Sequence, residues 1–208
     1  MRLRFAQVSS VRQVSSGNPC PFLWALVADG TLPDGLEPVK HIASALVDAA
    51  KKGEGAPTLP APGIYAVAFT ANWFGPSNVV HNLRHGVQLN ALRNGPYDKR
   101  GAGSRILNGL GQVDPEQLAR LAEFATEKTC LSGVKEPGLS LHEINVFMEA
   151  NFKRAKDRRR HVDRLLMRGE WPVLLAVMGK DSSKGRYLSV QDVRQLIVER
   201  QLPERMRQ

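Results

Sequence analysis

The fold prediction depends first on the stretch Gly17-Asn18-Pro19-Cys20-Pro21, which is followed by the apolar run Phe22–Ala28 and then by Asp29-Gly30. Pro21 stands where a helix accepts proline, in its first turn, because that N–H has no intrahelical partner anyway. Gly30 stands where a left-handed residue ends a helix. We therefore expect a short helix that begins at Cys20. A helix N-terminus favours the thiolate form of cysteine, and a rigid Pro-Cys-Pro frame suits a metal ligand better than a nucleophile or a redox centre.

This segment resembles the N-terminal motif of the heme-thiolate peroxidases, the family of chloroperoxidase and the unspecific peroxygenases. The motif of that family reads Pro-Cys-Pro, a short helix, Gly, Leu-Pro and a further Gly. This chain supplies, in that order, Pro19, Cys20, Pro21, Gly30, Leu32, Pro33 and Gly35. The resemblance implies heme b with Cys20 as the axial ligand of its iron, and with Pro19, Pro21 and Phe22 beside the cofactor. The competing interpretation is a buried structural cysteine without chemistry.

A second resemblance lies near the C-terminus. Members of the family carry a glutamate, small and apolar residues and then Gly-Asp on a late helix, and further on a sequence like Glu-Arg-x-Leu-Pro. The segments 168–181 and 199–204 fit these patterns. The resemblance implies that Glu170 is the distal acid–base residue, since peroxide must lose a proton from one oxygen and gain one on the leaving oxygen. The competing interpretation is an ordinary carboxylate in the first turn of a helix.

The middle of the chain departs from the family pattern, which places a divalent cation beside a heme propionate. One alignment matches Asp98 to the metal-binding glutamate and Lys99 to a histidine that orients the distal glutamate. Lys99 and Arg100 would repel Mg²⁺ or Mn²⁺ there, and either could neutralise the propionate directly. A rival alignment uses 82–86 and leaves no carboxylate at all. Lys99, Arg100 and His85 thus remain candidates for orienting Glu170.

Composition and charge restrict the class of protein. A chain of 208 residues with a formal net charge of +9 forms one domain with a substantial core. No apolar run is long enough to span a membrane, no secretory signal is visible, and two cysteines form no disulfide framework, so we expect a cytoplasmic protein. The segment Lys153–Arg168 is strongly basic. A solvated helix face explains it better than a nucleic-acid site, because no aromatic interleaving accompanies it.

The helical spacing of apolar residues predicts an all-α fold. An extended arm over 1–18 leads to the helix after Cys20. The segment 64–74 fits a buried helix or strand, and the helix is favoured because the other segments are helical. Further helices are expected at 37–52 and 79–93, after Asp114-Pro115, from the capping box Ser140-Leu-His-Glu143 as far as Arg168, at 170–178, and from Ser189 to Leu202. The stretches 94–111 and 181–189 are expected to be loops. Phe69 and Trp73 are core residues by default and, with a heme present, candidates for lining an apolar substrate channel.

Together these observations predict a compact, single-domain, chloroperoxidase-like helical fold over 1–208. The leading hypothesis is a peroxidase or peroxygenase that uses hydrogen peroxide to oxidise or oxygenate a small apolar or aromatic substrate. Two alternatives remain: a non-catalytic heme binder or sensor, and a descendant of the scaffold that binds an anionic partner through its basic helix. The sequence does not define an oligomeric state.

Overall fold

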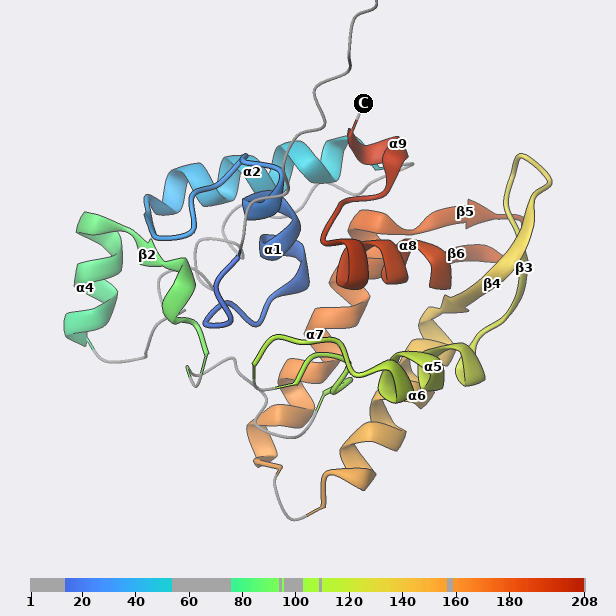
Figure 1. Cartoon of the computed structure of the whole chain (residues 1–208). Helices are drawn as coiled ribbons and strands as arrows, with labels where there is room; N and C mark the ends of the chain where they lie inside the picture. Colours follow the sequence, from blue (N-terminus) through green and yellow to red (C-terminus); the bar gives the residue numbers. More distant parts are fainter. Residues whose placement is uncertain are drawn as a thin grey trace, which may run out of the picture.

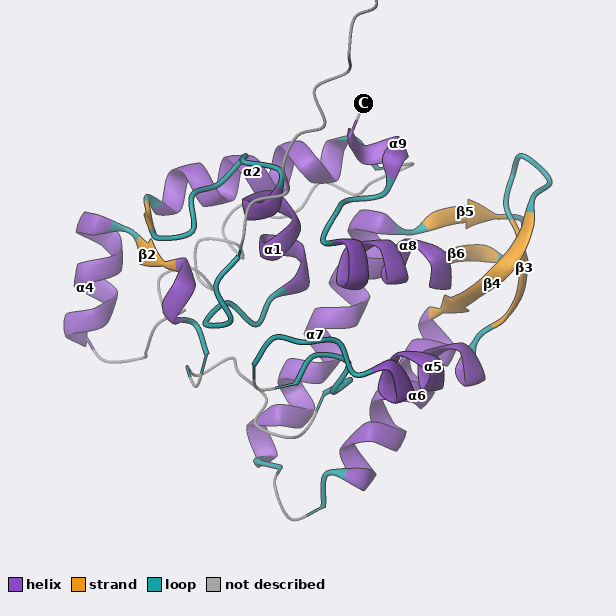
Figure 2. Cartoon of the chain, in the orientation of Figure 1, coloured by secondary structure: helices purple, strands orange, loops and turns teal. Residues whose placement is uncertain are grey.

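The structure is a computed structural model that describes residues 14–53, 76–93, 95, 103–108, 110–156 and 159–207. Figure 2 shows helices and strands within it. Its helices and helical turns are α1 (Pro21–Ala28), α2 (Val39–Lys51), α4 (Pro76–His85), η1 (Leu89–Ala91), α5 (Pro115–Phe124), α6 (Leu141–Arg154), α7 (His161–Met178), α8 (Val190–Arg194), the π-helical turn η2 (Gln195–Glu199) and α9 (Glu204–Arg207). Its strands are β1 (Leu36–Glu37), β2 (Val87–Gln88), β3 (Thr126–Thr129), β4 (Lys135–Ser140), β5 (Lys180–Ser182) and β6 (Gly185–Ser189).

The prediction of an all-α fold is wrong, because the chain forms a mixed α/β structure with two antiparallel sheets. Strands β1 and β2 pair as a small ribbon, and the second sheet has the order β3-β4-β6-β5. The stretch 181–189, expected to be a loop, is a hairpin whose turn closes between Ser182 and Gly185. Strand β4 pairs with β6 across some fifty residues of chain, Leu139 opposite Leu188, and both of these leucines are fully buried.

A carboxylate joins the strands of the second sheet. Glu136 on β4 accepts hydrogen bonds from Lys180 Nζ (2.7 Å), Tyr187 Oη (2.8 Å) and Ser189 Oγ (2.8 Å). Burial opposes ionisation of Glu136, but these three donors outweigh it and lower the pKa of the carboxyl. The same carboxylate, together with burial, raises the pKa of the Tyr187 hydroxyl.

Several predicted helices are confirmed because their end signals are local. Helix α1 ends at Ala28. Gly30, the residue after its C-cap, has a left-handed φ of +86°, as the sequence predicts. Asp114 caps α5 by accepting hydrogen bonds from the amides of Glu116 (3.0 Å) and Gln117 (3.1 Å). The Ser140–Glu143 capping box opens α6 as expected.

Other helix boundaries differ from the prediction. The helix expected at 170–178 is the second half of α7, and the helix expected from Ser189 to Leu202 ends at Glu199. The helix expected over 79–93 ends at His85, because Gly86 takes a φ of +105° and leads into β2. The long helix expected as far as Arg168 is two helices: α6 ends at Arg154 and α7 begins at His161. Buried Asp163 starts α7 by accepting a hydrogen bond from Arg160 N at 2.7 Å. The basic segment is therefore a helix end, a connection and a helix start.

The core lies where α1, α7 and the second sheet meet. Figure 1 shows α1 near the middle of the molecule, α2 beside it, and the chain end with α8, η2 and α9 between α1 and the second sheet. Fully buried side chains come from all of these elements and include Trp24, Leu26, Phe147, Met178, Leu188 and Met206. The core thus joins residues from both ends of the chain.

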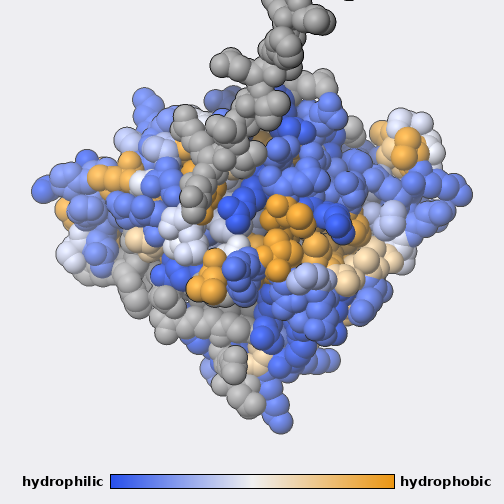
Figure 3. All heavy atoms as spheres, viewed as in Figure 1, coloured by the Kyte–Doolittle hydropathy of each residue, from blue (hydrophilic) through white to orange (hydrophobic). Residues whose placement is uncertain are grey.

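One face of the molecule is mostly polar. Hydrophilic residues cover most of the face in Figure 3, and an apolar patch lies near its centre. Within the described residues, no helix has both the length and the apolar character that crossing a bilayer requires.

Candidate functional site

Cys20 is half-buried and forms the N-cap of α1. Its backbone is extended (φ −87°, ψ 112°), and its carbonyl oxygen accepts a hydrogen bond from Trp24 N at 3.0 Å. Pro21 has no N–H, so the amides of Phe22 and Leu23 precede the first intrahelical hydrogen bond. The Cys20 side chain therefore stands at a helix end that stabilises negative charge, as the sequence predicts.

Asn18 fixes the backbone in front of Cys20. Its side chain is 0% exposed, and its Oδ1 accepts a hydrogen bond from Cys20 N at 3.1 Å. Its Nδ2 is buried as well and has no acceptor within the part of the chain that the structure describes. Sequence reasoning missed Asn18, although an asparagine whose side chain bonds the amide two residues on is a common turn signal. Buried donors are normally satisfied by a protein group or by ordered water.

Glu170 lies in the middle of α7 and is half-buried. Met167, one turn earlier on the same face, is 1% exposed, and Trp171, the next residue, is 3% exposed. The interpretation as an ordinary carboxylate in a helix first turn is therefore wrong. Pro172 also lies inside the helix, where its missing N–H leaves one carbonyl of the preceding turn without its intrahelical donor.

The loop 103–114 contacts both α1, which Cys20 caps, and α7, which carries Glu170. At one end Gly103 N lies 3.4 Å from the sulfur of Met167, one helical turn before Glu170. At the other end Gly111 packs on Trp24 of α1, so closely that a Cβ would lie 2.9 Å from the indole ring. Lys99 and Arg100 precede this loop in the sequence.

The two motifs that carry the family resemblance also contact each other. The guanidinium carbon of Arg200, in the segment 199–204, lies 4.2 Å from the centroid of the Trp24 ring. Arg200 takes a left-handed φ of +56°, which is uncommon for a side chain of this size. A cation over an indole ring is favourable, so this contact helps to hold the C-terminal segment on α1.

The remaining candidates do not complete one described site. His85 is exposed at the end of α4, with its ring 4.9 Å from that of His81, and α4 lies apart from α7 in Figure 1. The structure therefore does not bring His85 together with Glu170. Lys99, Arg100, Phe69 and Trp73 lie outside the described residues. No group of three histidine, cysteine or acidic residues that could hold a metal ion occurs among the residues searched, which are those the structure describes.

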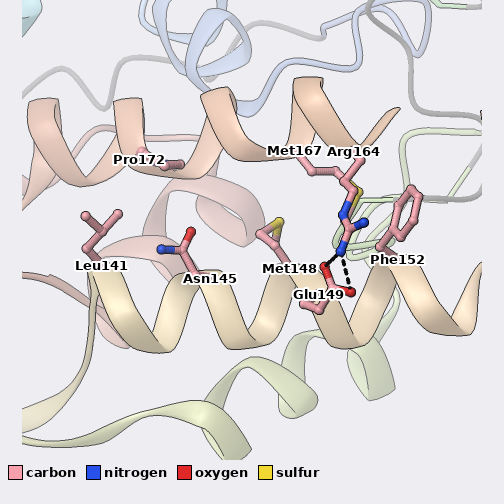
Figure 4. A pocket seen from close by; sticks show the side chains of 8 residues that line it. All are labelled: Leu141, Asn145, Met148, Glu149, Phe152, Arg164, Met167 and Pro172. Atoms are coloured by element: carbon pink, nitrogen blue, oxygen red, sulfur yellow. Dashed lines mark hydrogen bonds and ion pairs between the residues drawn. The ribbon is translucent and has the colours of Figure 1, made fainter. Parts of the chain in front are cut away.

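Two arginines of the basic segment Lys153–Arg168 are paired with carboxylates. Arg160 donates to buried Asp163 at 2.6 Å, and Arg164 donates to both oxygens of Glu149 at 2.9 and 2.8 Å. Arg159 lies over the ring of Phe152 at 4.4 Å. Figure 4 shows Arg164 and Glu149 joined across a hollow of about 630 Å³ between α6 and α7. These pairs support the interpretation as a solvated helix surface.

The second cysteine has a different setting. Cys130 lies beside the β3–β4 hairpin turn, with its Sγ 2.8 Å from Ser132 Oγ. That hydrogen bond is the main cause that lowers the pKa of the Cys130 thiol. Cys130 is thus a second thiol, placed on the β3–β4 hairpin and not on α1.

Comparison with models of protein families, with curated proteins and with solved structures finds no match for this chain.

Proposed function

We propose that the protein is a heme-thiolate oxidoreductase that uses hydrogen peroxide to oxidise or oxygenate a small apolar or aromatic molecule. The observation that carries the proposal is the loop 103–114, which packs on α1 beside Trp24 and on α7 one turn before Glu170. The two residues that the resemblance marks as functional are thus carried by helices that share one loop.

The described residues fit a heme ligated by Cys20. The donor set is a half-buried thiol at the N-cap of α1, preceded by a buried Asn18 whose Nδ2 has no acceptor within the described chain. Pro19 and Pro21 restrict the backbone on both sides of this thiol. Bound there, heme supplies the redox chemistry, and a thiolate ligand favours cleavage of the O–O bond of peroxide.

Glu170 moves the proton in this proposal. Its carboxylate takes the proton from one peroxide oxygen as a general base and delivers it to the leaving oxygen as a general acid. Met167, one turn before Glu170, and Trp171, directly after it, are buried apolar residues that flank this carboxylate on α7. Lys99 and Arg100, which precede the loop in the sequence, remain the candidates for orienting Glu170.

The first test is the absorption spectrum of purified protein supplied with heme, oxidised and then reduced under carbon monoxide. We expect a strongly red-shifted Soret band that the Cys20→Ala variant loses. Cys130→Ala is the matched control, since it removes the other thiol, and it should retain the band. A protein that takes up no stoichiometric heme contradicts the proposal, as does loss of the band in the control alone.

A non-catalytic heme binder or sensor is the alternative that keeps Cys20 but does not need Glu170. Glu170→Gln separates the two functions, because it keeps the shape of the side chain and removes its proton transfer. In the enzyme, heme uptake persists and peroxide-dependent turnover falls by about 10²–10⁴-fold. In a binder or sensor, any weak turnover stays at the level of the unaltered protein.

The proposal includes a cytoplasmic location. It rests on the sparse use of cysteine, since Cys20 and Cys130 are thiols and form no disulfide. Secretion with disulfide formation would contradict this part of the proposal.

A further inference from the structure

Helix α7 is apolar on the side that faces away from the core as well as on its core side. The core side includes Met167 and Trp171, which are 1% and 3% exposed. The opposite side, at the three- and four-residue spacing of one helix face, consists of Val162, Leu165, Gly169, Pro172, Val173 and Ala176, here called the outer stripe. Val162 is 43% exposed, Leu165 70% and Val173 49%. A helix that is apolar on both sides is normally covered on both, so the outer stripe needs a partner.

The outer stripe reads nearly the same in both directions along the helix. Helix α7 has 18 residues, and Gly169 stands at its middle. Leu165 and Val173 lie four residues to either side of that glycine, and Val162 and Ala176 lie seven residues to either side. Two copies of α7 that run antiparallel across a two-fold axis at Gly169 would therefore set apolar residues against apolar residues along the whole stripe. A glycine at the axis lets the two backbones approach closely.

An apolar hollow opens beside the outer stripe, between α6 and α7. It has a volume of about 630 Å³, and its lining includes Pro172 of the stripe and Leu141 of α6, which is 49% exposed. Figure 4 shows Pro172 and Leu141 toward one end of this hollow and the ion pair of Arg164 toward the other. Leu165 and Pro172 lie on the same flank of the stripe and at similar distances from the two-fold axis, so the axis brings Leu165 of a second copy opposite Pro172. The most exposed side chain of the stripe thus meets the mouth of a hollow.

We propose that the outer stripe is the interface of a homodimer, in which two α7 helices pack antiparallel across a two-fold axis at Gly169. Leu165 of each copy packs on Pro172 at the mouth of the hollow of the other copy. The proposal does not depend on heme binding, because Cys20 and Glu170 are not part of the stripe.

Charge and area determine how strong this contact is. Antiparallel packing sets the positive end of each helix dipole beside the negative end of the other, which is favourable. A helix of 18 residues is only about 27 Å long, so two such helices bury less than the roughly 800 Å² per partner of a standard interface. The net charge of +9 on each chain also opposes association. We therefore expect a reversible dimer with a dissociation constant in the micromolar range.

The test is sedimentation equilibrium of the purified full chain over a range of protein concentrations. We expect a reversible monomer–dimer equilibrium. Leu165→Glu should raise its dissociation constant by about a hundredfold or more, since each dimer loses two apolar contacts and gains two charges. Leu131→Glu is the matched control: Leu131 is 75% exposed on the β3–β4 hairpin, apart from α7 in Figure 1, and this change should leave the dissociation constant within about twofold. Both leucines are exposed, and circular dichroism verifies that both variants fold.

A double variant tests the antiparallel register. Leu165→Lys and Val173→Glu should each weaken the dimer, because each places a charge in the stripe. Combined in one chain, they should strengthen association by about tenfold relative to either single variant, since the two-fold axis sets position 165 of one copy opposite position 173 of the other. Higher ionic strength should strengthen the dimer of the unaltered chain, because salt screens the repulsion between two basic chains.

Four outcomes would overturn the proposal. They are a chain that stays monomeric at every concentration, equal weakening by Leu165→Glu and Leu131→Glu, no recovery in the double variant, and a dimer that salt dissociates.

Discussion

At the scale of single residues, Gly86 sets how α4 joins β2. Its φ is +105°, and a Cβ on it would lie 2.2 Å from the carbonyl oxygen of Glu37. Gly86 N donates to Asn82 O at 3.0 Å and so closes the last turn of α4, while the next residue, Val87, pairs with Glu37. A side chain at this position must therefore displace the backbone of β1.

We predict that Gly86→Ala lowers the free energy of unfolding by about 2–4 kcal/mol, through backbone strain and overpacking together. Gly133 provides the matched control, because it has a φ of +87° with nothing within 4 Å of a Cβ. Gly133→Ala should cost about 1–2 kcal/mol, from the left-handed conformation alone. Urea denaturation followed by circular dichroism measures both. Equal losses would show that the approach to Glu37 carries no cost.

The site residues show the limit of sequence reasoning at this scale. Motifs single out Cys20 and Glu170 as candidates, because each lies in a short run of residues that resembles the family pattern. Asn18 bonds the amide of Cys20, a local turn contact that the sequence could have indicated. Arg200 lies over the ring of Trp24, which is far away in the sequence, and no local pattern marks that contact.

At the scale of elements, Glu143 connects the start of α6 to β3. It accepts hydrogen bonds from Ser140 N (2.6 Å), Thr126 Oγ1 (2.5 Å) and Lys128 Nζ (3.0 Å). Burial opposes ionisation of this carboxyl, but the hydrogen bonds, led by that of Lys128, outweigh it and lower the pKa from 4.5 to about 2. Ionised Glu143 is thus favoured in the folded state.

The sign of the pH dependence follows from that lowered pKa. Above pH 4.5 the carboxylate is ionised in both states and its stabilisation is fully present; the stabilisation is lost as the pH falls toward about 2. We predict that Glu143→Gln costs about 1–2 kcal/mol near pH 7, after allowance for solvent screening, and almost nothing near pH 2. Denaturation of both proteins at several pH values measures the difference. A difference that is constant with pH would contradict the prediction.

Elements with local end signals are predictable, and those formed by distant pairing are not. The caps at Asp114, Ser140 and Gly30 lie within a few residues of the helices that they limit. Strand β4 contains Pro137 and Gly138, which argue against a strand, and β3 consists of threonine and charged residues without apolar alternation. Strand β4 pairs with β6 on one side and with β3 on the other. No periodicity of the sequence reveals these pairings.

At the scale of the whole molecule, the C-terminal segment closes the core that the N-terminal helix opens. Arg200 lies over Trp24, and Arg205 donates to Asp192 Oδ2 at 2.7 Å and to the carbonyl of Met178. Met206 on α9 is 0% exposed. Leu26, Met206 and residues of α2 line one hollow on this side of the molecule. The last residues are therefore part of the fold.

We predict that Met206→Ala lowers the free energy of unfolding of the whole chain by about 2–4 kcal/mol, because it removes buried apolar volume that the surroundings cannot refill completely. Arg207→Ala is the control, since this neighbouring side chain is exposed and bonds only Gln201 Oε1 among described residues; its effect should stay within about 0.5 kcal/mol. Urea transitions followed by tryptophan fluorescence and by circular dichroism should shift together in Met206→Ala. If α9 frayed independently, neither transition would move, and the single core that joins both ends of the chain would be wrong.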